Sequence, residues 1–131
     1  YLVRGNFETL LLSRDPHVRE VTLRICYHFG NSTVIPLMSH ILSSLSDQNA
    51  FCRFHALKAL QKYMKELKGM ISIALFNLIR NSTTPLETYQ MTIYPLVPHL
   101  FQLLSDSNSN VVAKALKVFI FEMNLFLTLI R

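Results

Sequence analysis

The 131-residue chain combines a high apolar content with a basic charge balance. Hydrophobic residues make up 50% of it, charged residues only 16%, and the formal net charge is +5. Three glycines, five prolines and 11% aromatic residues exclude a linker-rich or disordered chain, and two cysteines do not make a disulfide framework. We therefore expect one domain with many buried helix faces, whose basic excess suits an acidic partner.

The apolar periodicity predicts eight helices in four antiparallel pairs, without strands. In chain order the expected helices cover 2–13, 16–29, 34–45, 49–67, 70–80, 85–94, 96–104 and 110–130. Pro16 suits a helix start, while Gly30 and Gly69 are expected to end the second and fourth helices. The side chains expected to face the core from the second helix are Val18, Thr22, Ile25 and Phe29.

An internal repeat organises these helices. The pattern Pro-Leu-x-x-His-x-x-x-x-Leu-Ser-Asp occurs at 36–47 and again at 95–106. Asp47 and Asn49 can cap the helix that follows the first copy. The second helices open at 18, 52, 86 and 111, so two intervals of 34 residues precede one of 25. A truncated second helix in the third pair, or residues missing near Ile93 to Pro95, would explain the short interval.

The turns add a further pattern, in which an aspartate precedes an apolar residue and an arginine at the start of the second helix. The copies are Asp15, Val18 and Arg19; Asp47, Cys52 and Arg53; and Asp106, Val111 and Val112, the last without arginine. With prolines near the first helices, this resembles HEAT and armadillo-type repeats over nearly the whole chain. The resemblance implies an all-α, right-handed α-α superhelix (an α-solenoid) of about four hairpins, without an active site. The repeats would cover roughly 1–30, 34–68, 70–94 and 95–131.

We further expect 1–131 to be a single repeat domain from a longer solenoid, with flanking repeats. Solenoids cap their ends with polar faces, yet the last helix is crowded with apolar residues. These residues are Leu125, Phe126, Leu127, Leu129 and Ile130. An apolar face is therefore expected to stay uncovered on the first and last pairs.

The cysteines and histidines point to packing. Cys26 and Cys52 fall on core positions of the repeat, so buried inert thiols are expected and a metal site is not. His40 and His99 recur at one repeat position, as packing residues do. The sequence shows no nucleophile with an evident base and no phosphate-binding glycine loop, so we expect neither an enzyme nor a cofactor.

Basic residues form a row on the second helices, and this row is the predicted binding site. Arg24, Lys58 and Lys117 share one repeat position, and Lys62 and Lys65 extend the row. That position lies more than about 100° round the helix from the expected core stripe, so the row should face outward. Reversing Lys58 and Lys62 to glutamate should abolish partner binding and leave the melting temperature nearly unchanged.

Two function classes follow from these observations. The first is a non-enzymatic protein-interaction scaffold that binds a partner, such as an acidic segment, through the second-helix surface. A special case is tubulin binding, because TOG domains are built of HEAT repeats and bind through their intra-repeat turns; here Arg14 and His17 form the basic turn edge. The second class is nucleic-acid or acidic-tail binding, which the salt dependence of binding would distinguish. Without a signal peptide or a membrane span, a cytoplasmic protein is expected, with the nucleus as the alternative.

Overall fold

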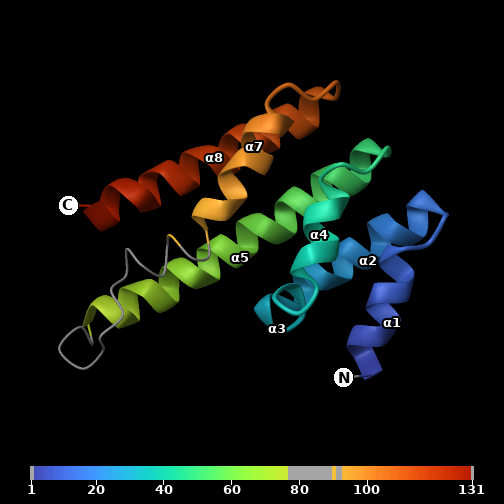
Figure 1. Cartoon of the computed structure of the whole chain (residues 1–131), viewed down its shortest axis with the longest axis horizontal. Coiled ribbons are helices and arrows are strands. Elements are labelled where there is room, and N and C mark those ends of the chain that lie inside the picture. The colour runs from blue at the N-terminus through green and yellow to red at the C-terminus, as the bar shows by residue number, and fades with distance from the viewer. Residues whose placement is uncertain (1, 77–89, 91–92, 131) are drawn as a thin grey trace.

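The computed structural model describes residues 2–76, 90 and 93–130 (Figure 1). These residues form helices and turns and contain no strand, which confirms the all-α prediction for this part of the chain. The helices are α1 (Leu2–Leu11), α2 (Pro16–Phe29), α3 (Asn31–Val34), α4 (Met38–Ser44), α5 (Ala50–Phe76), the 3-10 helix η1 (Tyr94–Leu96), α7 (Val97–Leu103) and α8 (Ser109–Ile130).

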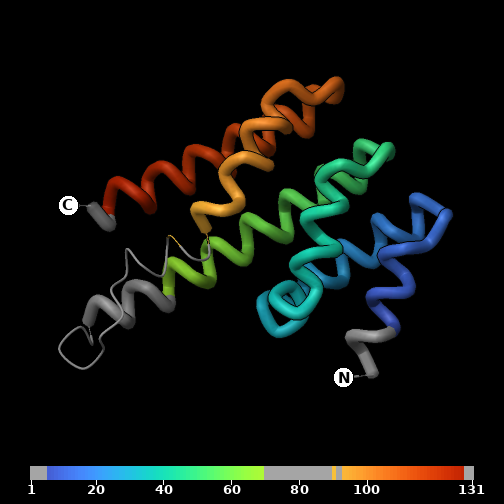
Figure 2. The backbone as a smooth tube through the Cα atoms, in the orientation of Figure 1, coloured from blue at the N-terminus to red at the C-terminus, as the bar shows by residue number. Residues whose placement is uncertain are grey.

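The described residues form three helical hairpins in two layers. Within the hairpins α1 packs on α2, α4 on α5 and α7 on α8. Between hairpins the second helices pack side by side, α2 on α5 and α5 on α8. Figure 2 shows that the three hairpin turns follow one another along one edge, at the right of the view. The second helices therefore form a continuous layer, in which α5 lies between α2 and α8.

The start and the end of α2 lie where the sequence predicts them. The Asp15 carboxylate accepts a hydrogen bond from the His17 N–H at 2.9 Å, and Pro16 occupies the first turn. Gly30 ends the helix with φ +68°, and its N–H donates to the carbonyls of Cys26 and Tyr27. A capping acceptor at one end and a positive-φ glycine at the other explain these bounds.

The turns before α5 and α8 share one hydrogen-bond pattern. Asn49 Oδ1 accepts from the N–H groups of Phe51 and Cys52, and Asp47 Oδ1 accepts from the Asn49 N–H. This confirms the predicted capping role of Asn49, whereas Asp47 binds the N–H of Asn49, one residue before α5. Before α8, Asp106 and Asn108 make the equivalent bonds. The sequence repeat at these two turns therefore encodes a repeated helix start.

The predicted core stripe of α2 is partly wrong. Thr22 is buried, as expected, but Ile25 and Phe29 are 36% and 59% exposed. Leu23 and Cys26 are fully buried in their place. The predicted and the observed buried residues both recur with helical spacing. The residues that are buried are set by the packing of α2 on α5. The buried face of α2 is therefore displaced by about one residue along the sequence from the predicted face.

The predicted third pair, 70–94, does not begin as a new helix at residue 70. Gly69 does not end α5, which continues to Phe76, and α5 packs directly on α8. Glycine costs about 1 kcal/mol within a helix, which the packing of a long helix can outweigh. The second helix expected at 85–94 falls mostly on residues outside the described ranges.

Candidate functional site

An arginine and an aspartate join the first two hairpins through a two-point contact. Arg19 on α2 donates from Nε to Asp47 Oδ2 at 2.8 Å and from Nη2 to Asp47 Oδ1 at 3.0 Å. Its Nη1 donates to the Ser13 carbonyl at 2.7 Å. Burial raises the pKa of the Asp47 carboxyl, but hydrogen bonds from Arg19 and the Asn49 N–H outweigh it and lower this pKa overall. The pair fixes the α1–α2 turn against the α4–α5 turn.

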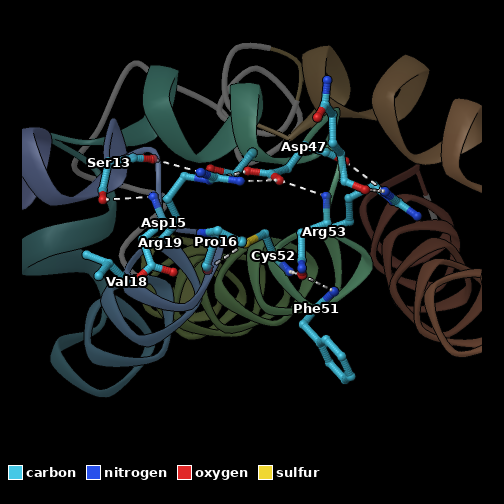
Figure 3. A network of polar contacts seen from close by, with 12 residues as sticks. Ser13, Asp15, Pro16, Val18, Arg19, Asp47, Phe51, Cys52 and Arg53 are labelled. Atoms are coloured by element: carbon cyan, nitrogen blue, oxygen red, sulfur yellow. Dashed lines mark hydrogen bonds and ion pairs between the residues drawn. The ribbon is translucent and has the colours of Figure 1, made fainter.

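A second arginine repeats this contact one hairpin further on. Arg53 Nε lies 2.8 Å from Asp106 Oδ1, and Arg53 Nη2 donates to Asp106 Oδ2 at 3.0 Å. Arg53 Nη1 also donates to the Asp47 carbonyl at 2.7 Å, so the two contacts form a connected network (Figure 3). The arginine in each turn pattern is thus paired with the aspartate of the following hairpin. This network holds the three second helices in register.

The residues of the predicted basic row differ in exposure. Arg24 on α2, Lys65 on α5 and Lys117 on α8 are exposed. Lys58 and Lys62 are half-buried, with their ammonium groups 4.9 and 4.7 Å from the Tyr27 ring centroid.

Lys62 is used inside the protein. Its Nζ donates to the Tyr27 carbonyl at 2.7 Å, at the C-terminal end of α2, where a cation is favoured. This geometry overturns the sequence-based view of Lys62 as an outward-facing cation. The reversal Lys62→Glu is therefore expected to lower the melting temperature, contrary to the sequence-based expectation.

A groove of about 550 Å³ lies on the second-helix surface and is lined by residues of α2, α5 and α8. Its basic side chains are Arg24 from α2 and Lys114 and Lys117 from α8. Its aromatic side chains, Phe51 and Phe54, come from the first turns of α5. Two members of the predicted row therefore line one groove, together with a lysine that the row did not include.

Charges within the groove are predominantly positive. Lys114 has a lowered pKa because it is partly buried and because Lys58, Lys117 and Lys65 repel its charge. Its Nζ donates to Gln61 Oε1, a neutral acceptor that does not offset this repulsion. An anion bound in the groove would relieve the repulsion, so the arrangement favours negatively charged ligands.

A histidine and a carboxylate form the polar part of the groove. His55 Nε2 lies 3.4 Å from Glu20 Oε1, and both side chains are largely buried. Burial lowers the pKa of His55, and the opposite charge of Glu20 acts against this by raising it. Glu20 is therefore an acidic residue in a groove whose other charged side chains, Arg24, Lys114 and Lys117, are basic.

Phe51 is the most exposed aromatic residue of the groove, at 65%. In Figure 3 its ring points away from the arginine–aspartate network. Phe54 is half-buried, and its ring meets the His55 ring edge-on at 5.4 Å between centroids. Sequence reasoning missed Phe51, Phe54 and Lys114 because none belongs to the repeat pattern. The one available signal was an aromatic residue in the first turn of a helix, beside the capping Asn49.

The alternative turn edge, Arg14 and His17, lies outside the groove lining. Both residues are exposed, and His17 Nδ1 lies 3.6 Å from Glu20 Oε2. The structure therefore separates the two predicted binding surfaces.

The two cysteines occupy the core, as predicted. Both are free thiols without solvent exposure. Burial raises the pKa of Cys26 to about 11, and the Cys52 thiol donates to the Pro16 carbonyl at 3.3 Å. In the ranges that the structure describes, histidine, cysteine and acidic residues form no cluster that could hold a metal ion.

None of the helices described is both long and apolar enough to cross a membrane. Comparison of the chain with protein-family models, with curated proteins and with solved structures gave no match.

Proposed function

We propose that the chain is a non-enzymatic protein-interaction module whose second-helix surface binds an acidic segment of a partner protein. In this proposal the three hairpins are part of an α-solenoid of the HEAT or armadillo type, which acts as a scaffold in the cytoplasm or nucleus. The layered packing of α2, α5 and α8 and the network from Arg19 to Asp106 support such a repeat arrangement.

The observation that carries the proposal is the convergence of cations on one groove. Arg24 reaches it from α2 and Lys114 and Lys117 reach it from α8, on either side of α5. Glu20, the acidic residue of the groove lining, is paired with His55. Isolated surface ion pairs contribute little, but several cations around one groove act together. An extended acidic segment can contact both sides at once.

The test uses a fluorescently labelled peptide of alternating glutamate and glycine and measures its anisotropy on titration with the protein. The groove variant combines Arg24→Gln with Lys117→Gln, and both side chains are exposed, so folding should be preserved. We expect about tenfold weaker binding, as two modest charge contacts predict, and a loss of affinity with added salt.

The matched control is Arg14→Gln, which removes an exposed arginine on the turn edge. It should leave peptide binding within about twofold of the unmodified protein. If Arg14→Gln weakens binding and the groove variant does not, the turn edge is the binding surface, as the tubulin-type alternative requires. If a single-stranded oligonucleotide binds more tightly than the peptide, the partner is a nucleic acid and not a protein.

A further inference from the structure

The groove places an aromatic strip between two basic sides. Phe51 and Phe54 project from α5, which packs between α2 and α8. Arg24 lies on one side of this strip, and Lys114 and Lys117 lie on the other. Since α5 is the middle helix of the layer, a chain that crosses the second helices meets a cation, then the aromatic pair, then further cations.

Phe51 has no part in the core of the described hairpins. It is 65% exposed, although a phenylalanine at a helix start gains free energy when it is buried. Its backbone N–H is held by Asn49 Oδ1 at 2.9 Å, so the first turn of α5 fixes where the side chain emerges. A positioned and exposed aromatic residue, in a groove that also holds charged side chains, is typical of an anchor site in a protein interface.

From this arrangement we infer that the groove binds an extended acidic segment that carries one bulky apolar residue, with acidic residues on both sides of it. The inference rests on the proposed function and specifies its partner. The apolar side chain packs against Phe51 and Phe54, while the flanking carboxylates pair with Arg24 on one side and with Lys114 and Lys117 on the other. The groove volume of about 550 Å³ accommodates a leucine or phenylalanine side chain together with the adjoining backbone.

Helix geometry sets the spacing of this motif. Packed helices lie about 8–10 Å apart, and an extended chain advances about 3.3 Å per residue. The acidic residues should therefore stand about three positions before and three positions after the apolar anchor. A segment whose acidic residues all stand on one side of the anchor can satisfy only one basic side of the groove.

The experiment compares three labelled synthetic peptides of equal length and equal charge. The first has a central phenylalanine with acidic residues three positions to each side. The second has serine in place of the phenylalanine, and the third keeps the phenylalanine but gathers the acidic residues on one side. The unmodified protein should bind the first peptide about tenfold more tightly than either of the others, as the burial of one aromatic side chain predicts.

The protein variant is Phe51→Ala, with Leu12→Ala as the control, because Leu12 is exposed but does not line the groove. Phe51→Ala should remove most of the tenfold advantage of the first peptide and leave the serine peptide unchanged. Leu12→Ala should change neither affinity.

The outcomes separate the two proposals. Equal binding of the first two peptides to the unmodified protein would overturn the apolar anchor and leave acidic binding intact. If the first peptide still binds Phe51→Ala more tightly than the serine peptide does, the apolar anchor packs elsewhere on the protein. If the third peptide binds the unmodified protein as tightly as the first, the two-sided motif is wrong. If none of the three peptides binds at low salt, the proposed function itself is wrong.

Discussion

At the residue scale, the joint between α2 and α3 depends on one glycine and on two side chains of α5. Gly30 adopts φ +68° and ψ −150°, a region open almost only to glycine. Glu66 accepts a hydrogen bond from the Asn31 N–H at 3.1 Å, and Lys62 binds the Tyr27 carbonyl. The carboxylate thus lies at the start of α3 and the ammonium at the end of α2, where each charge is favoured by the helix dipole.

Gly30 and Gly69 give a matched pair of substitutions. In Gly30→Ala the added Cβ would lie 2.6 Å from Glu66 Oε1 on a backbone that alanine rarely adopts. We expect a loss of about 1–3 kcal/mol in the free energy of unfolding. Gly69→Ala places its Cβ in open space within α5 and should stabilise the protein by about 0.5–1 kcal/mol.

Urea unfolding followed by circular dichroism measures both free energies. The two substitutions make the same chemical change, so opposite signs isolate the effect of backbone conformation. Equal effects at the two glycines would contradict the assignment of Gly30 as the positive-φ joint.

At the element scale, local sequence rules predicted the starts of α2 and α5 but not the end of α5. Asp15, Pro16, Asp47 and Asn49 act on the backbone next to them, so local rules located the starts of α2 and α5 correctly. Gly69 was expected to stop α5, but a glycine ends a helix only if the chain adopts a left-handed turn there. That choice depends on tertiary packing, which local sequence does not contain.

The arginine–aspartate contacts between hairpins provide a test at this scale. Asp47 accepts two hydrogen bonds from Arg19, whereas Asp15, the N-cap of α2, pairs with no arginine in the part of the chain that the structure describes. Asp47→Asn should lower the free energy of unfolding by about 1–3 kcal/mol, because the charge-assisted bonds are lost. Asp15→Asn should change it by only a few tenths of a kcal/mol, because asparagine caps helices as well as aspartate does.

The pH dependence of this difference has a defined sign. The folded pKa of Asp47 is lowered, so its contribution is fully present above the unfolded pKa of about 3.9. The contribution is lost as the pH falls through the folded pKa, because the carboxyl is then protonated in both states. The gap in stability between the unmodified protein and Asp47→Asn should be constant near neutral pH and shrink in acid. A gap that widens in acid would contradict the arginine–aspartate pairing.

At the scale of the whole molecule, the repeat predicted equivalent hairpins but not the binding groove. The 59-residue offset between the two copies of the Pro-Leu-His pattern indicated equivalent hairpins, and the described structure confirms equivalent turns there. The helix break expected at Gly69 within this offset was wrong, since α5 reaches Phe76, and the rest of the expected third pair lies mostly outside the described residues. The repeat supplied two of the groove cations, Arg24 and Lys117, but the groove itself could not be predicted, because only the packing of three helices brings them together with Phe51 and Lys114.

An apolar stripe along α8 is the other feature of the whole surface. Its members are large exposed side chains at helical spacing, namely Leu116, Ile120, Met123 and Leu127. An uncovered apolar face was expected on the last pair, and of the residues named for it Leu127 belongs to this stripe whereas Leu125 is buried. Contiguous apolar patches of this kind attract other apolar surfaces, whereas single exposed apolar residues do not.

We expect the α8 stripe to bind an environment-sensitive apolar dye and to promote self-association. The variant that combines Ile120→Ser with Leu127→Ser divides the stripe and should roughly halve the dye fluorescence, with the free energy of unfolding unchanged within about 0.5 kcal/mol. The control is Leu12→Ser, which removes a single exposed leucine at 70% exposure outside the stripe and should not affect the dye. Sedimentation velocity over a concentration series should show less association for the α8 variant than for the control. If the control reduces dye binding as much as the α8 variant does, the dye reports scattered apolar residues and the stripe has no special role.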